Sequence, residues 1–346
     1  MPGFDHGRSN GTPDAPGPTA SLGALWEVRT PTRLSAPVLA DGTVLVGGED
    51  GTVRTFDART GADRWQAAVG ERAGAPRVRE GVVYVPTDAG VAALNADGGS
   101  RRWILDVPNR EGLLVAPHGV YFVDGGDDPS VVDVAPDTGA ERWRARIDGP
   151  WTSTLFADDE HVFVSTGTLA ERPWVLGTDG ETLLGNRDLR ESEDAIEEQF
   201  VDDGTVLAVD SMFGEVEANT PGDGDYRKAW GRLFDAYGET ELAGGNDHVY
   251  YAADGGEAPG LYALSLADGT TAWRVETEWD LVDRPAVATD AVVVPTEDAV
   301  RCFDPTDGSE QWCHPSQGSG PGVALVDDML YTTTDGVLRA LRSVPE

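Results

Sequence analysis

The feature that most restricts the fold of this chain is a tryptophan that follows a glycine by four residues and recurs at nearly constant intervals. The repeats are ARTGADRW ending at Trp65, ADGGSRRW at Trp103, PDTGAERW at Trp143, LADGTTAW at Trp273 and PTDGSEQW at Trp312. The next turn follows 16 residues after Trp26, Trp65, Trp103 and Trp312, and 17 residues after Trp143, Trp230 and Trp273. Spacing this regular indicates one supersecondary unit copied along the chain.

Each unit contains four short alternating or apolar runs separated by turns. In the first unit they are APVLA (36–40), TVLVGG (43–48), TVRTFD (52–57) and DRWQAAV (63–69), which we name strands A, B, C and D. Short runs rich in Val, Thr, Tyr and Phe, with turns at regular intervals, predict an all-β fold. Repeated four-stranded units of about 40 residues are typical of a β-propeller.

The count of units predicts eight four-stranded antiparallel blades. The fourth unit has Leu184 where Trp is expected, and the fifth has a longer C–D connection that ends at Trp230. The eighth unit ends after strand C, whereas residues 24–30 carry a strand D with no A, B or C before it. We therefore expect the N-terminal strand to complete the last blade and close the ring. The predicted organisation is a flexible leader (1–23) followed by one propeller domain (24–346).

The repeat resembles the pyrroloquinoline-quinone-type (PQQ-like) propeller repeat, over residues 24–342. That family includes quinoprotein alcohol dehydrogenases, BamB-type lipoproteins of outer-membrane barrel assembly and secreted haloarchaeal proteins. The opening PGFDHGRSNGTPDAPGP resembles the lead-in of the haloarchaeal members. The resemblance implies a blade-docking role, rather than ligand contact, for the repeat tryptophans Trp26, Trp65, Trp103, Trp143, Trp230, Trp273 and Trp312.

The resemblance also raises the alternative of a PQQ-binding enzyme. Such dehydrogenases carry adjacent cysteines beside the quinone, but Cys302 and Cys313 are eleven residues apart. They carry long insertions, whereas eight blades use nearly this whole chain, and no Glu, Asn and Asp set for calcium stands out. We therefore favour a protein with no catalytic residues, no metal and no cofactor, and keep PQQ with calcium as the alternative.

Composition restricts the partners. Asp and Glu number 61 against 26 Lys and Arg, a formal net charge of −35, and Lys228 is the only lysine. A surface this acidic would be repelled by nucleic acid and by anionic membranes. No run approaches the roughly 20 apolar residues of a membrane span. We interpret the acidity as adaptation to high salt, where screening suppresses repulsion between carboxylates, and keep an acidic calcium-binding surface as the alternative.

A binding surface is expected where the D–A and B–C loops open around the central channel. Aromatic and basic residues expected on this face are Arg33, Arg110, Trp151, Tyr237, Trp279 and His314. Such a mixture is common in recognition surfaces. Alternatively, Trp151 and Trp279 only plug the channel mouth. We predict a monomeric, noncatalytic scaffold or binding protein with an unidentified protein partner.

The predicted location is extracellular or anchored at the cell surface. MPGFDHGRSN has neither the basic start nor the apolar stretch of an export signal. Asn10-Gly11-Thr12 is nevertheless a glycosylation sequon. We therefore expect that the numbered Met replaces a removed export or lipoprotein signal.

The two cysteines flank the C–D hairpin of the seventh unit. If Phe303 pairs with Trp312, constant antiparallel register places Cys302 opposite Cys313, within disulfide range. This pairing predicts a disulfide, which would suit an oxidising compartment. The alternative is two separate free thiols, because a one-residue bulge would send the side chains to opposite faces.

Overall fold

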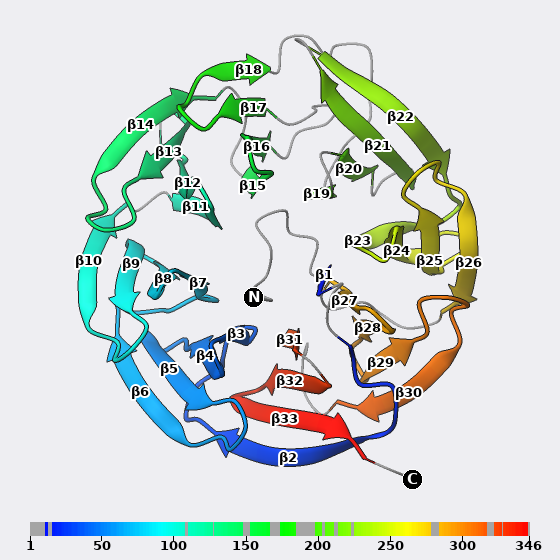
Figure 1. The fold of residues 1–346 in the computed structure, drawn as a ribbon, viewed down its shortest axis with the longest axis horizontal. Helices are drawn as coiled ribbons and strands as arrows, with labels where there is room; N and C mark the ends of the chain where they lie inside the picture. Colours follow the sequence, from blue (N-terminus) through cyan, green and yellow to red (C-terminus); the bar gives the residue numbers. More distant parts are fainter. Residues whose placement is uncertain are drawn as a thin grey trace.

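The computed structural model confirms the eight-bladed propeller (Figure 1). It describes residues 11–12, 16–107, 110–126, 128–147, 153–166, 174–184, 198–202, 205–210, 214–222, 225–277, 284–316, 322–326 and 328–344. The described residues form strands and turns, and none of them belongs to a helix long and apolar enough to cross a membrane.

Blades one to four follow one another around the ring, each with its first strand innermost (Figure 1). Blade one contains β3 (Val38–Ala40), β4 (Thr43–Gly47), β5 (Thr52–Asp57) and β6 (Asp63–Ala68). Blade two contains β7 (Arg77–Arg79), β8 (Val82–Thr87), β9 (Gly90–Asn95) and β10 (Arg101–Asp106). Blade three contains β11 (Arg110–Ala116), β12 (Gly119–Asp124), β13 (Ser130–Val134) and β14 (Glu141–Arg146). Blade four contains β15 (Ser153–Ala157), β16 (His161–Thr166), β17 (Trp174–Gly177) and β18 (Thr182–Leu184).

Blades five to seven repeat this order. Blade five contains β19 (Glu198–Asp202), β20 (Thr205–Asp210), β21 (Glu215–Gly222) and β22 (Asp225–Leu233). Blade six contains β23 (Tyr237–Gly245), β24 (His248–Gly255), β25 (Gly260–Ser265) and β26 (Thr271–Glu276). Blade seven contains β27 (Ala286–Ala288), β28 (Ala291–Pro295), β29 (Ala299–Phe303) and β30 (Glu310–Pro315).

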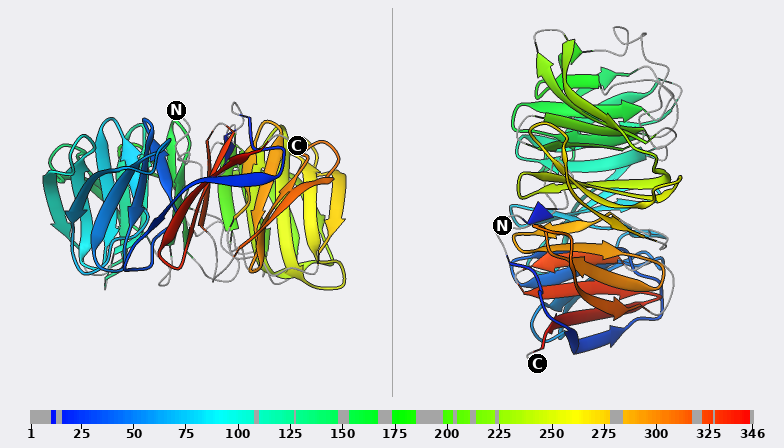
Figure 2. Two further views of the ribbon diagram at one scale, coloured as in Figure 1. Left: turned by 90° about the horizontal axis from the view of Figure 1, so that it is seen from below. Right: turned by 90° about the vertical axis from the view of Figure 1, so that its right-hand side faces the viewer.

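The eighth blade is built from both ends of the chain. It contains β31 (Gly322–Val326), β32 (Met329–Thr334), β33 (Val337–Ser343) and, as its outermost strand, the N-terminal β2 (Leu22–Arg29). β2 pairs antiparallel with β33, with Val28 opposite Leu338. The side views in Figure 2 show β2 and β33 side by side at the rim. The predicted closure by an N-terminal strand is therefore confirmed.

The described part of segment 1–23 lies against the propeller. β1 (Gly11–Thr12) pairs parallel with β27 near the ring centre. The backbone NH of Gly17 then donates to Asp290 Oδ1 of blade seven at 2.5 Å. β2 begins at Leu22, two residues before the predicted domain boundary.

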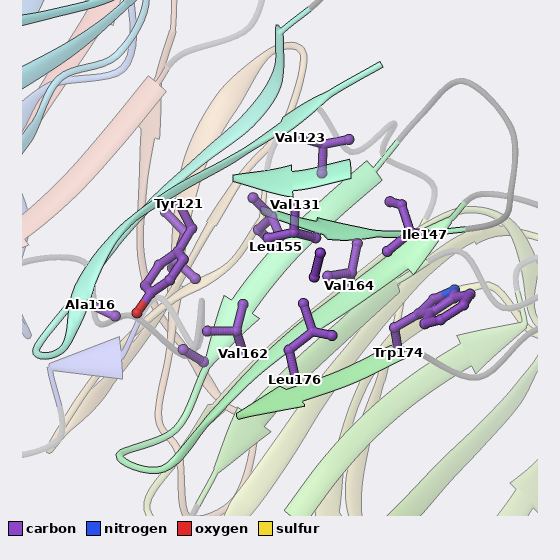
Figure 3. Close-up of a cluster of buried hydrophobic side chains, with 13 residues drawn as sticks. Ala116, Tyr121, Val123, Val131, Ile147, Leu155, Val162, Val164, Trp174 and Leu176 are labelled. Atoms are coloured by element: carbon purple, nitrogen blue, oxygen red, sulfur yellow. The ribbon is translucent and has the colours of Figure 1, made fainter. Parts of the chain in front are cut away.

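The hydrophobic core lies between neighbouring blades. One cluster joins Tyr121 and Val131 of blade three to Leu155 and Leu176 of blade four (Figure 3). Val132, the next residue along β13, packs on the other side, in the cluster shared with blade two. Both faces of a middle strand are therefore covered, which explains why strands such as β13 are buried throughout their length.

Antiparallel order within each blade places the D–A and B–C connections on one face of the ring and the A–B and C–D turns on the other. Isolated bridges tie D–A segments to the end of strand B, joining Leu34 to Gly48 and Ala73 to Thr87. Backbone pairing therefore fixes these parts of the D–A face.

Candidate functional site

The repeat tryptophans join neighbouring blades. The indole Nε1 of Trp273 in blade six donates to the carbonyl oxygen of Pro305 in the C–D hairpin of blade seven at 2.8 Å. Its ring lies against Gly308 of that hairpin, whose φ is 74°. A Cβ at Gly308 would lie 2.6 Å from Trp273 Cε3, so the glycine of each motif makes room for the tryptophan of the preceding blade.

Five other tryptophans make the same kind of indole-to-carbonyl bond to the next blade in the ring. The pairs are Trp26 with Ala58, Trp65 with Ala96, Trp103 with Pro136, Trp143 with Thr178 and Trp230 with Leu266. Blade four has Leu184 at this register position, opposite Val175, as Trp65 stands opposite Thr55.

Trp312 of blade seven makes its bond differently. Blade eight has no C–D hairpin, because its strands C and D come from opposite chain ends. The indole of Trp312 instead donates to the carbonyl of Pro18. We call residues 16–20, which cross blade seven here, the N-terminal strap.

The predicted Cys302–Cys313 disulfide is wrong in this structure. Both cysteines are free, and Cys302 pairs with Trp312 while Cys313 pairs with Arg301. A register shift between Cys302 and Phe303 explains the error, because it skips one residue of β30. Cys302 shares its face with Trp312 and is buried. Cys313 follows Trp312 on β30, so it points to the opposite face and is exposed.

The predicted binding-face residues lie at separate places around the ring. Arg33 lies in the D–A segment that follows β2, with Nη2 3.3 Å from Asp335 Oδ1 in the B–C turn of blade eight. Arg110 and Tyr237 begin strands β11 and β23 on the same face. His314 lies within strand β30, opposite Val300, and not in the predicted D–A loop. Three further predicted residues lie outside the described residues: Trp151, Trp279 and the sequon residue Asn10.

Arg110 lines a pocket of about 530 Å³ on the D–A face, between blades two and three. Two more arginines line it: Arg72 in the D–A segment before blade two, and Arg77 at the start of β7. Among the described residues that line the pocket, Asp88 is the acidic one. We call this feature the arginine pocket.

The guanidinium groups of Arg77 and Arg110 have few partners. Arg77 Nη1 donates to the carbonyls of Ala75 and Pro76 at 3.3 and 3.2 Å. Arg110 Nη1 donates to the carbonyl of Gly112 at 2.6 Å, while its buried Nε has no hydrogen-bond partner. Within the described parts of the chain, neither side chain forms an ion pair with a carboxylate.

Burial lowers the pKa of Arg77 and the pKa of Arg110 from the usual value for arginine, although both stay protonated. For Arg110 the charge of Asp88 opposes this effect. Arg72 is more exposed, and its Nη2 lies 4.0 Å from Glu49 Oε1. The pocket is thus a partly buried positive site in a chain of net charge −35.

Of the three arginines in the pocket, Arg110 was predicted from the sequence, whereas Arg72 and Arg77 were not. A signal was available, because GERAGAPRVRE places three arginines within eight residues of a strongly acidic chain. Their convergence with Arg110 depends on the packing of blade two against blade three, which the segment itself does not encode.

The two cysteines do not fit the adjacent pair that the PQQ-like resemblance associates with a quinone, since they lie on opposite faces of β29 and β30. No group of three or more His, Cys, Asp or Glu side chains that could hold a metal ion occurs among the residues with assigned positions.

Comparison with known proteins identifies the family. The family model described as outer membrane protein assembly factor BamB matches residues 20–110, 87–183 and 200–342. The protein of that name from Alkalilimnicola ehrlichii is 28% identical over 200 residues, which are 53% of this chain and 50% of the relative. Serine/threonine-protein kinase AfsK of Streptomyces griseus is 34% identical over 140 residues, 35% of this chain and 17% of the kinase. The chain therefore spans half or less of the length of these relatives.

A solved structure shows the same fold. The crystal structure of the computationally designed Ika8 protein has a TM-score of 0.74 and 17% identity, and the alignment covers 92% of this chain and 99% of Ika8. Because the family model covers most of the sequence, and the structure has the propeller that the PQQ-like repeats predict, the chain belongs to the family described as outer membrane protein assembly factor BamB.

Proposed function

We propose that this protein is a noncatalytic scaffold that binds another protein through its D–A face. The observation that carries the proposal is the family match, because an assembly factor for outer membrane proteins acts on other proteins. The propeller offers a broad face on which Arg33, Arg110 and Tyr237 occupy separate blades. Such a surface suits contact with a macromolecule. We propose no cofactor for this function.

Site-specific photocrosslinking tests which face binds the partner. We would place p-benzoylphenylalanine at Arg33 on the D–A face and, as the matched control, at Arg59 in the C–D hairpin of blade one. Both side chains are exposed, and the two faces are opposite. Adducts in native membranes that form from position 33 and not from position 59 would support the proposal. Absence of adducts from position 33, or equal adducts from both positions, would contradict it.

The alternative of a quinone enzyme has its own test. PQQ and calcium would be added to the purified protein, and absorbance and tryptophan fluorescence followed. We expect no saturable change. Tight, saturable binding would overturn the assignment as a noncatalytic protein.

We further propose that the protein works in high salt, outside the cell or at its surface, as a monomer. Lowering salt from 1 M to 0.1 M lengthens the Debye screening distance from about 3 Å to about 10 Å, which increases repulsion among the excess carboxylates. The melting temperature should therefore be higher at 1 M KCl than at 0.1 M KCl. An unchanged melting temperature would contradict the adaptation to salt, and recovery of the native protein only from the cytosol would contradict the location.

A further inference from the structure

Arg77 occupies a position that is apolar in the other seven blades. It pairs with Tyr84, the third pair outward from the A–B turn. The residues at the same register position are, in chain order, Val38, Leu114, Phe156, Phe200, Ala243, Ala286 and Ala324. The propeller repeat therefore does not need a charge at this position, and the arginine requires another explanation.

An arginine here is costly for the folded state. Partial burial of a guanidinium removes water from it, and this loss is offset only if its donors and its charge find partners. Arg77 and Arg110 bond to nearby carbonyls, but no ion pair neutralises either of them among the described residues. A partly buried guanidinium that forms no ion pair, with Asp88 as the acidic residue described in the lining, favours an anion that enters from outside.

The pocket walls are held in place without a ligand. Gly74 NH donates to the Pro86 carbonyl at 2.8 Å, and Ala73 bridges to Thr87, so the D–A segment is fixed to strand β8. On the other wall, a register shift between Glu111 and Leu114 forms a bulge at the point where Arg110 enters β11. Bulges often redirect side chains beside functional sites.

We propose that the arginine pocket binds a small organic or inorganic dianion through its carboxylate, phosphate or similar oxyanion groups. Arg77 and Arg110 form no ion pair among the described residues, and these two positive charges match a dianion, while Arg72, 4.0 Å from Glu49, adds a third arginine to the lining. Planar guanidinium groups bind such oxyanions through paired hydrogen bonds. A volume of about 530 Å³ lies within the range of small-molecule sites.

A compact ligand is favoured over an acidic protein segment. The net charge of −35 repels a polyanion over the rest of the surface, whereas a dianion inside the pocket places all its charge beside the arginines. This site would bind its ligand whether or not the D–A face also binds a protein.

Calorimetric titration tests the site directly. Succinate and inorganic phosphate would each be titrated into the full chain at constant ionic strength, with acetate as the monoanion control. We expect saturable binding of at least one dianion and none of acetate. Arg77→Gln and Arg110→Gln should each weaken that binding by about tenfold or more. Arg59→Gln, in the exposed C–D hairpin of blade one and outside both the pocket and the D–A face, should leave it unchanged.

A stability measurement separates ligand binding from a structural role. Arg77→Val restores the kind of residue that Val38 provides in blade one, so the ligand-free variant should melt no lower than the wild type but should lose binding. Binding of neither dianion, or equal binding by wild type and Arg77→Gln, would overturn the proposal. A hexaglutamate peptide that binds where both small dianions fail would likewise overturn it in favour of an acidic protein ligand. A lower melting temperature of Arg77→Val in a protein that binds no dianion would assign Arg77 a purely structural role.

Discussion

The interface between blades six and seven and the interface between blades seven and eight use the same bond with different pieces of chain. In the first, Trp273 donates to Pro305 of a C–D hairpin, 32 residues away. In the second, Trp312 donates to Pro18 of the N-terminal strap, 294 residues away. The docking position therefore requires a carbonyl acceptor and a close backbone, and it does not require a hairpin.

The difference between the two interfaces lies in how they form. A hairpin brings its acceptor close as soon as one blade folds, because its loop is short. The strap reaches Trp312 only when the N-terminal segment meets blade seven, across 294 residues of chain. Contacts between such distant residues form late and slowly in folding. The bond of Trp312 thus depends on contact between the two ends of the chain, whereas the bond of Trp273 depends only on neighbouring blades.

Removal of the docking indoles tests whether the two interfaces are equally strong. Trp273→Ala and Trp312→Ala should each lower the free energy of unfolding by about 3–5 kcal/mol, because both indoles are buried. Trp312 is 5% exposed and Trp273 is 8% exposed, so we expect losses of similar size. Urea denaturation followed by tryptophan fluorescence would measure them. A loss at Trp312 below 1 kcal/mol would show that the strap does not substitute for a hairpin.

Removal of residues 1–18 should affect only the interface that the strap covers. It takes away the acceptor of Trp312 and should cost about 1–3 kcal/mol, since a buried indole NH loses its partner. It should also uncover Cys302, whose Sγ lies 3.7 Å from the Pro18 carbonyl.

Thiol titration gives this second readout. In the intact native protein Cys313 should react and Cys302 should not, because burial raises the pKa of the Cys302 thiol. Both should react in the truncated protein. Cys302→Ser is the control that identifies the second thiol, and an unreactive Cys302 after truncation would refute the covering role of the strap.

Methyl groups added at Gly308, the docking glycine for Trp273, and at Gly17 of the strap should give unequal losses. Gly308→Ala should cost about 2 kcal/mol, because the new Cβ meets the Trp273 ring and the residue has a φ of 74°. Gly17→Ala brings the new Cβ within 2.5 Å of Ala291 Cβ, but Gly17 is not among the glycines with positive φ, so its loss should be smaller. Gly98→Ala, with open space around the new methyl group, is the control. Equal melting temperatures for all three variants would contradict the close fit at Gly308 and at Gly17.

The smallest expected effect is a pH dependence of stability at the interface between blades seven and eight. Burial and the nearby charge of Arg339 in blade eight lower the pKa of His314 below its usual 6.5. The unfolded chain therefore takes up a proton near pH 6.5 before the folded chain does, so stability should fall as the pH drops through and below 6.5. His314→Gln should remove this part of the pH dependence, measured as melting temperature from pH 8 to pH 5. An identical profile in wild type and variant would refute it.

The sequence alone determined the repeated unit, its four strands, the number of blades and the closure by an N-terminal strand. These features follow from local signals: turn residues at fixed spacing, a docking tryptophan and an unmatched strand D around Trp26. Even the degenerate fourth blade was readable, since Leu184 takes the tryptophan register position opposite Val175.

The sequence could not determine the pairing of the cysteines, because one skipped residue reverses which face a side chain occupies. The register shift beside Cys302 recurs in the C–D pair of blade one, between Thr55 and Phe56, so it belongs to the blade and not to the cysteines. Counting residue pairs along a regular antiparallel hairpin could not reveal this register shift.

Only the tertiary structure decided the arginine pocket and the strap. Arg72, Arg77 and Arg110 come from a connection and from the first strands of two successive blades. Pro18 and Trp312 meet across 294 residues of chain. Local sequence patterns specify the secondary structure of each segment. Contacts between blades depend on how the whole ring packs, and that packing brings these side chains together.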